Sequence, residues 1–137
     1  MSYGVSEALQ GAVYQRLVTD AAIGALIGTA VFDELPIGTK PETYVVLGEE
    51  DVRDRSDCSG GAALHRFVVS VVTDAAGYAG AKSVAAAVSD ALVNAPLALS
   101  RGRLVGLWFE RATARRSGKA GKVRRIDLRF RAHVDDT

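Results

Sequence analysis

The chain has 137 residues, of which 48% are hydrophobic and 24% charged, a composition typical of a globular domain rather than a disordered chain. Its single cysteine, Cys58, excludes a disulfide scaffold, and no apolar run reaches the roughly 18 residues that a transmembrane helix needs. The net charge of +1 hides an asymmetry, because residues 1–94 carry 6 basic and 12 acidic side chains, whereas residues 95–137 carry 11 and 4.

The first predicted element is an amphipathic helix over residues 4–19, with Ser2 or Ser6 as its candidate cap. Apolar residues recur there at steps of three and four and so line one helix face: Val5, Leu9, Ala12, Val13 and Leu17. Thr19-Asp20 is expected to open a second, short helix, Ala21–Leu26, which ends near Gly28.

The middle of the chain is predicted to be extended. Val31–Pro36 forms a short strand or an extended link, and Thr43–Gly48 forms a strand because of its β-branched and aromatic residues. Glu49–Ala63 is rich in Asp, Ser and Gly, which predicts a flexible loop. Leu64–Thr73 is the clearest central strand, because apolar residues on both of its faces suit a strand that is covered on both sides.

The last part of the chain combines a helix with a strand pair. Tyr78–Asn94 is the predicted helix, and its packing face consists of Ala81, Val84, Ala85, Val88, Ala91 and Leu92. Arg103–Arg115 and Lys122–Asp135 form the strand pair around a polar loop. The apolar face of the second strand consists of Ile126, Leu128, Phe130, Ala132 and Val134.

These elements predict an α+β fold with a mostly antiparallel four-stranded sheet and helices packed on one face. No linker or internal repeat divides the chain, so a single domain is expected over residues 1–137. The N-terminus shows no basic and apolar leader, which predicts a chain that is made and kept in a reducing cytoplasm, or in something assembled there.

The residue pattern offers little catalytic chemistry. The chain has two histidines, His65 and His133, and they form no ligand spacing for a metal with Cys58. The acidic neighbours Asp54 and Asp57 are expected to raise the pKa of the Cys58 thiol, which disfavours a nucleophile. No serine elbow or phosphate-binding loop motif is present. We therefore expect no enzyme activity, no metal and no cofactor.

Basic residues near the C-terminus are the strongest candidates for an interface. The candidates on the predicted strand pair are Arg111, Arg115, Arg116, Arg125, Arg129 and Arg131. Guanidinium groups bind carboxylates or phosphates in bidentate fashion, so such a stripe fits an acidic partner. Equally, it fits a solvent face held by cross-strand pairs with Glu110 or Asp127. Sequence-specific DNA binding is less favoured, because Trp108 is the one aromatic residue available for interleaving, and it is equally suited to the core.

Two polar segments are the other interface candidates. The acidic one contains Glu49, Glu50, Asp51 and Asp54, and it lacks the residue order of a calcium-binding loop. The basic one is the hairpin tip with Lys119 and Lys122. A solvated or partner-contacting role is expected for both, because long polar loops commonly carry contacts.

Several segments together resemble a known family, although no single motif is specific to it. The resemblance runs from about Leu9 to Val134 and rests on the order and spacing of Ala21–Gly28, Val31–Pro36, Pro41–Gly48, His65–Val72, Ala95–Leu97, Gly102–Val105 and Leu128–Ala132. These segments resemble the tail-completion or tail-terminator proteins of long-tailed phages and of phage-like gene transfer agents.

The resemblance implies a structural virion protein without a catalytic site, assembled in the bacterial cytoplasm. It implies a homohexameric ring on the head-proximal end of the tail tube, at the tail–neck junction, that stops tube polymerisation. The implied partners are the tail tube protein, a head–tail connector protein and double-stranded DNA that passes through the channel without sequence-specific binding; no membrane is implied. The acidic and basic parts of the chain are suited to a contact between neighbouring copies.

Two alternatives remain open from the sequence. The first is a head–tail connector subunit of the neck, a stopper or an adaptor, which is also a small ring subunit. The second is a basic-faced nucleic-acid-binding module, which the excess of arginine after residue 94 favours.

Overall fold

In the computed structural model, which describes residues 3–34, 37–54 and 62–136, two helices come first, followed by three strands, a third helix and a final strand pair. The α-helices are α1 (Ser6–Thr19), α2 (Ala21–Ile27) and α3 (Ala79–Leu92), and a short 3-10 turn, η1, covers Lys119–Gly121. The strands are β1 (Val31–Phe32), β2 (Thr43–Asp54), β3 (Ala62–Thr73), β4 (Arg103–Ser117) and β5 (Val123–Asp135).

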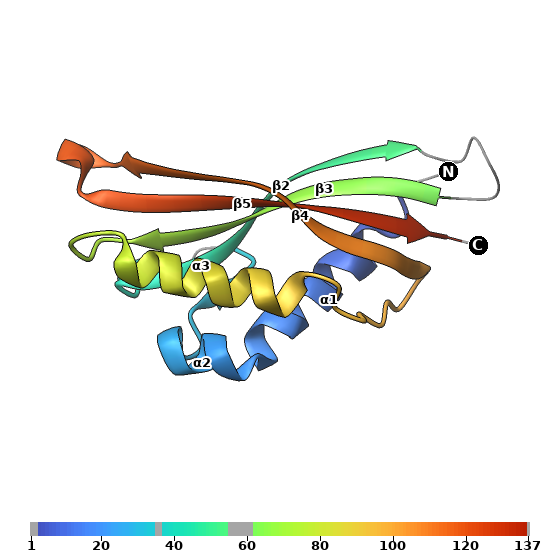
Figure 1. Cartoon of the computed structure of the whole chain (residues 1–137), viewed down its shortest axis with the longest axis horizontal. Helices are drawn as coiled ribbons and strands as arrows, with labels where there is room; N and C mark the ends of the chain where they lie inside the picture. The colour runs from blue at the N-terminus through green and yellow to red at the C-terminus, as the bar shows by residue number, and fades with distance from the viewer. Residues whose placement is uncertain (1–2, 35–36, 55–61, 137) are drawn as a thin grey trace.

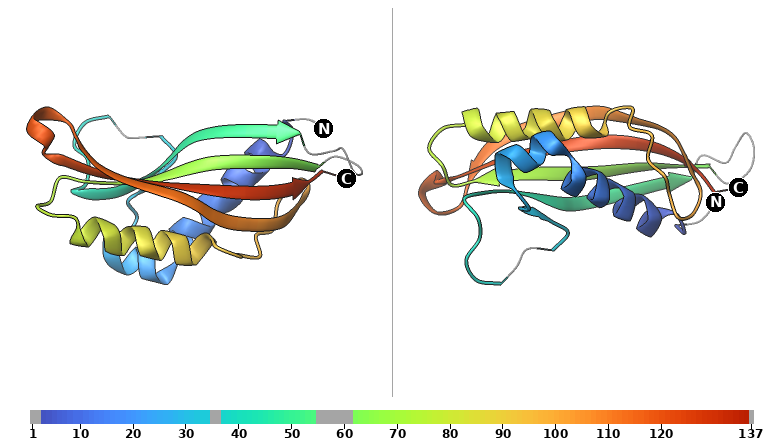
Figure 2. Two further views of the ribbon diagram at one scale, coloured as in Figure 1. Left: turned by 45° about the horizontal axis from the view of Figure 1, so that its top comes forward. Right: turned by 90° about the horizontal axis from the view of Figure 1, so that it is seen from below.

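The strands form one sheet in the order β1-β2-β3-β5-β4. Neighbouring long strands are antiparallel, whereas β1 runs parallel to β2 through Val31 and Phe32. All three α-helices lie on the same face of the sheet (Figure 1, Figure 2). The predicted α+β class with helices on one face is therefore confirmed, but the strand number of four is wrong. The fifth strand is β1, the segment that the sequence left open between a strand and a link.

The turn between α1 and α2 follows the sequence prediction. The Asp20 carboxylate accepts a hydrogen bond from the Ile23 backbone N–H at 3.0 Å, which caps the start of α2. Gly28 ends α2 with a φ of 62°, a left-handed conformation that favours glycine.

The start of α1 does not follow the prediction. Its N-cap residue is Val5 and makes no side-chain cap, so the prediction that Ser6 caps this helix is wrong, and Ser2 lies outside the described residues. The Ser6 hydroxyl instead donates to the carboxylate of Glu50 on β2, at 2.8 and 2.7 Å from its two oxygens. The first turn of α1 is thereby tied to the sheet.

Strand β2 is longer than predicted, because Glu49–Asp54 is strand rather than loop. The loop prediction rested on acidic composition, but residues 62–67 of β3 supply the pairing that extends this strand. Ala62 and Ala63, also predicted as loop, begin β3, and residues 55–61, with Asp57 and Cys58, lie outside the described residues. A bulge interrupts the pairing between Leu47, opposite Val69, and Glu50, opposite Phe67.

The bulge in β2 decides where the acidic side chains point. Val69 and Phe67 lie on the helix side of β3, so Leu47 and Glu50 both face the helices. Without the extra residue, strict alternation would place Glu49 there instead. The bulge therefore delivers Glu50 to Ser6 and to Tyr3, whose hydroxyl also donates to the Glu50 carboxylate.

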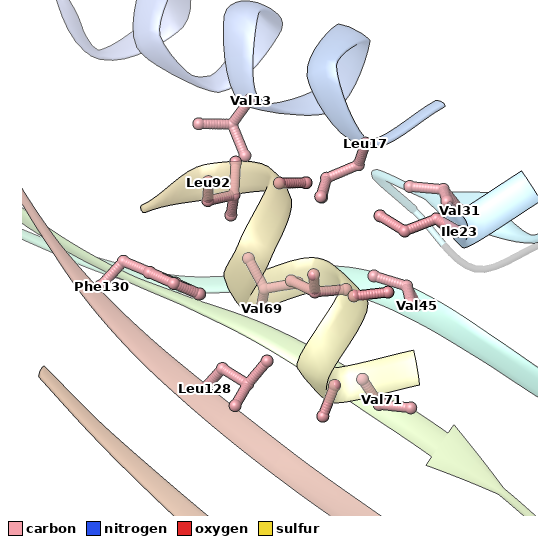
Figure 3. Packing of buried hydrophobic residues seen from close by; sticks show 14 of the residues in the cluster. Val13, Leu17, Ile23, Val31, Val45, Val69, Val71, Leu92, Leu128 and Phe130 are labelled. Atoms are coloured by element: carbon pink, nitrogen blue, oxygen red, sulfur yellow. The ribbon is translucent and has the colours of Figure 1, made fainter. Parts of the chain in front are cut away.

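The core lies between the helices and the sheet (Figure 3). The alternation predicted for the last strand is confirmed, because Ile126, Leu128, Phe130, Ala132 and Val134 are all buried. Every residue of the predicted packing face of α3 is also buried. Alanines in that face let α3 approach the sheet closely. Phe130 is fully buried and lies in ring contact with Phe67 and Phe109.

Strand β3 is covered on both faces only in its second half. Every residue from Val69 to Thr73 is buried, whereas Leu64, Arg66 and Val68 are half-buried. The helices cover one face, and side chains from β5 cover Ser70 on the other. The prediction of a strand covered on both sides is confirmed for this half alone.

His65 is a buried titratable group on the helix side of β3. Its side chain is 0% exposed, and neither ring nitrogen has a hydrogen-bond partner. Its Nδ1 lies 3.7 Å from Glu50 Oε2. Burial lowers the pKa of His65 below its ordinary value of 6.5, and the nearby Glu50 carboxylate opposes this shift only in part. His65 is therefore held neutral.

A lowered pKa in the folded state makes stability depend on pH. Below about pH 6.5 the unfolded chain binds a proton at His65 that the folded chain resists, so the free energy of unfolding falls as the pH drops towards the folded pKa. We expect His65→Leu to flatten the pH dependence of stability between about pH 7.5 and 5.5. The matched control is Leu64→Val, a neutral substitution on the same strand, which should leave that dependence unchanged. Urea titrations at the two pH values measure the free energy of unfolding of each protein. If His65→Leu loses as much stability between these pH values as wild type does, the prediction is contradicted.

Candidate functional site

The sheet face turned away from the helices is the candidate site, and we call it the open face (Figure 2). The even-numbered residues of β5 are buried under the helices, so the odd-numbered Arg125, Arg129 and Arg131 project from the open face. The pairing of β4 with β5 places Arg111 opposite Arg129 and Arg115 opposite Arg125. Five of the six predicted arginines thus gather on two adjacent strands, and we call these five the arginine cluster.

Arg116 does not belong to the arginine cluster. It lies opposite Arg124, whose Nη1 donates to the Ala75 carbonyl at 3.1 Å and whose guanidinium lies 5.5 Å from the centre of the Tyr78 ring. Those contacts lie on the helix side, so Arg116 also faces that side. The physical reason is the two-residue alternation of a strand, which sends the adjacent Arg115 and Arg116 to opposite faces.

The hairpin-tip lysines stand apart from the arginine cluster. Lys119 lies in η1 and Lys122 directly follows it, and both are exposed. They lie where β4 turns into β5, beyond the paired part of the sheet (Figure 1).

Asp127 is the centre of a charge network on the open face. Ser70 Oγ donates to Asp127 Oδ1 at 2.6 Å, and Arg125 Nε donates to the same oxygen at 2.8 Å. Arg115 Nη2 lies 3.4 Å from Asp127 Oδ2. Burial by itself would raise the pKa of Asp127, but the hydrogen bonds from Ser70 and Arg125 and the charges of Arg125 and Arg115 together lower it. The carboxylate is therefore held charged.

The remaining arginines are not neutralised in this way. Among residues 3–34, 37–54 and 62–136, Arg111, Arg129 and Arg131 make no ion pair. Arg131 lies 5.2 Å from the centre of the Trp108 ring, in a cation–π contact, and Trp108 is 37% exposed rather than part of the core. The solvent-face interpretation thus fits Arg115 and Arg125, whereas the other three cations remain available to a partner.

A shallow groove crosses the open face beside these cations. Its lining combines Glu49 and Val68 with four members of the arginine cluster. A second hollow next to it includes the Arg66–Glu110 ion pair, with 3.0 Å between nitrogen and oxygen. Sequence reasoning named Glu110 as a partner for a nearby arginine but did not identify Arg66. The sequence does contain a signal for Arg66, because a charged side chain within a mostly apolar strand indicates a polar partner.

The predicted acidic residues lie near the opposite edge of the sheet. Glu49, Glu50 and Asp51 are all exposed on β2, and Asp54 ends this strand. Glu50 faces the helices and accepts a hydrogen bond from Ser6. Asp51 accepts a hydrogen bond from Arg53 at 3.2 Å. No ion pair between this acidic group and the arginine cluster occurs in the described residues. The two charge groups therefore line the same groove without forming ion pairs, and β3 lies between their strands.

Metal and membrane sites find no support in the described parts of the chain. Residues 3–34, 37–54 and 62–136 contain no group of three or more His, Cys, Asp or Glu side chains arranged to hold a metal ion. None of the described helices is both long and apolar enough to cross a membrane.

This chain matches one family model and is similar to a solved protein structure. A family model described as "Tail completion protein gp17" matches residues 11–135. Among solved structures, a chain from the "Virion of native gene transfer agent (GTA) particle" is 63% identical to this chain, with a TM-score of 0.92. The match covers 98% of this chain and 99% of that chain. A search of curated proteins gave no match.

The charge network around Asp127 gives a stability prediction. We expect Asp127→Asn to lower the free energy of unfolding at neutral pH by about 1–3 kcal/mol, because Ser70 and two arginines lose a charged acceptor. The lowered pKa means that this stabilisation is present above pH 3.8 and is lost as the pH falls through the folded pKa. The difference from wild type should therefore vanish in strong acid.

Denaturant titrations of the two proteins from neutral pH down to about pH 3 measure this difference. The matched control is Glu42→Gln, an exposed carboxylate for which a change within about 0.5 kcal/mol is expected. Equal effects of the two substitutions would refute the stabilising role of Asp127.

Proposed function

This chain belongs to the tail completion protein gp17 family and is thus a structural tail protein, and we propose that it is the tail terminator of its particle. In this proposal it forms a ring, a homohexamer, on the head-proximal end of the tail tube. The ring stops further polymerisation of the tube and joins the tail to the neck and head. Its place is the tail–neck junction of a virion or phage-like particle.

The observation that carries this proposal is the similarity to a chain of a gene transfer agent virion. At 63% identity over nearly the whole length of both chains, the two have the same fold, element for element. Such a similarity covers surfaces as well as the core, because a core alone is conserved at much lower identity. A matching surface is what assembly into a particle of the same kind requires.

The charge distribution is suited to a ring. A closed ring needs a heterologous interface, in which one surface of a copy meets a different surface of the next. The arginine cluster and the acidic part of β2 are two such surfaces, and they lie apart within one copy. Opposite charges on them favour contact between copies and disfavour contact of each surface with itself.

The ring is proposed to let double-stranded DNA pass through its opening without sequence-specific binding. Arg111, Arg129 and Arg131 make no ion pair among the described residues, and guanidinium groups bind phosphates whatever the base sequence. The partners in this proposal are the tail tube protein on one side of the ring and a head–tail connector protein on the other.

Deletion of the gene tests this function. We expect tails of abnormal and variable length, no attached heads, and a return to uniform tails when the intact gene is supplied. Electron micrographs of purified particles measure tail length and head attachment. A connector subunit of the neck would instead give free tails of normal length, and a nucleic-acid-binding module would leave the particles intact. Either of these two results would overturn the terminator assignment.

The oligomeric state gives a second prediction. We expect the purified protein, or the ring isolated from tails, to have a mass of six times 14.4 kDa by light scattering after size exclusion. High salt should favour smaller species, because it screens the charge attraction between copies. A different multiple of the chain mass, both in solution and in tails, would contradict the hexamer.

A further inference from the structure

The sheet ends in two free backbone edges. On one side, β1 pairs with Val45 and Val46 only, so the outer side of β2 has no neighbouring strand from Gly48 to Arg53 among the described residues. On the other side β4 is the last strand. In the first half of β4, the Leu107 carbonyl already accepts a hydrogen bond from the Asn94 N–H. The second half of β4, Arg111–Ser117, pairs with β5 on one side and has no neighbouring strand on its other side among the described residues. Free edges are templates for pairing with another chain.

The two free edges carry opposite charges. Gly48–Arg53 holds three carboxylates and one arginine, Arg53, and we call it the acidic edge. Arg111–Ser117 holds three arginines and no carboxylate, and we call it the basic edge. The basic edge is exposed almost throughout. Two basic edges or two acidic edges repel one another, so a symmetric dimer through either edge is disfavoured.

We propose that the basic edge of one copy pairs with the acidic edge of the next, so that the sheet continues from copy to copy around the ring. This inference rests on the proposed ring and adds the surfaces that form it. The partner is a second copy of the same chain, because each copy carries both complementary edges and can therefore take one neighbour on each side.

The strand directions suit this pairing. Strands β2, β3, β5 and β4 alternate in direction, so β2 and β4 run antiparallel to each other. If neighbouring copies are related by a rotation that leaves the strand direction unchanged, β4 of one copy runs antiparallel to β2 of the next. The helices of all copies then stay on the same side of the continuous sheet.

The pairing also requires a defined stagger between copies. In one copy Asp51 is level with Arg66 of β3, whereas Arg115 is level with Val72, six residues further along that strand. Bringing Asp51 of the next copy level with Arg115 needs a shift of about 20 Å at roughly 3.3 Å per residue. Four strand spacings amount to about 19 Å, so the shift corresponds to a strand tilt of about 45°, at the upper end of the range found in closed barrels.

This register matches the side chains on both faces. Asp51 lies opposite Arg115 on the open face, and Glu50 lies opposite Arg116 on the helix side. Next to Asp51, Val52 lies opposite Ala114, and both point to the helix side. Arg116, which does not belong to the arginine cluster, thereby acquires a partner. Charge meets opposite charge in two adjacent pairs, and an apolar pair follows them.

Complementation between two charge-reversed variants tests the proposal. We expect Asp51→Arg and Arg115→Glu each to weaken ring assembly at least about tenfold in protein concentration, because each creates like charges at every contact. Mixed in equal amounts, the two variants should form rings again, since each supplies the edge that the other lacks. The matched control is Lys119→Glu at the hairpin tip, which should assemble like wild type. Light scattering measures the mass, and far-ultraviolet circular dichroism verifies the fold.

Covalent trapping provides a second readout that also works in assembled tails. The variant Val52→Cys, Ala114→Cys in a Cys58→Ser background should give a ladder of cross-linked multiples on oxidation, because opposed residues of antiparallel strands lie within disulfide range. Each single-cysteine variant should give no ladder, and neither should the mismatched pair Val52→Cys, Lys119→Cys.

The outcomes separate this inference from the proposed function. Restored assembly in the mixture together with a ladder supports edge pairing. Intact rings in the charge-reversed variants, or intact rings without a ladder, overturn edge pairing and leave the ring function standing. The absence of rings both in solution and in tails overturns the proposed function itself, and edge pairing with it.

Discussion

The two-residue alternation of β5 is the constraint on which the core and the open face both depend. This strand pairs along its whole length with β3 on one side and β4 on the other. Its even residues, with Phe130 at their centre, are buried under the helices, and its odd residues carry the charge network around Asp127. A slip of one residue would bury arginines and expose the core, so the register is fixed by the free energy of burial.

The bulge in β2 is the second decisive feature, because it breaks alternation at one place. It turns Glu50 towards the helices, where the hydroxyl of Ser6 satisfies the carboxylate and the neutral His65 lies beside it. Glu49 and Asp51 remain exposed on the strand. One extra residue thus ties one carboxylate of a run of three to a contact inside the subunit, while all three remain exposed on the edge strand.

The open face and the two edges together relate this fold to assembly. A sheet with helices on one face and bare edges satisfies its core within one chain but leaves backbone groups unpaired at both sides. Because the two edges carry charges of opposite sign, contact between the same edge of two copies is disfavoured. The same charges favour a contact that repeats in one direction, which is what the proposed ring requires.

The sequence by itself determined the elements whose burial pattern is strong: α1, α3 and the apolar face of β5 follow from periodicity, and the Asp20 cap of α2 follows from local chemistry. It also indicated the family, through the order and spacing of segments. Only the tertiary structure decided the extension of β2, the parallel pairing of β1, the inward turn of Glu50 and the separation of Arg116 from Arg115. Each of these depends on which strand lies alongside and in which register, and pairing between distant segments leaves no local pattern in composition or periodicity.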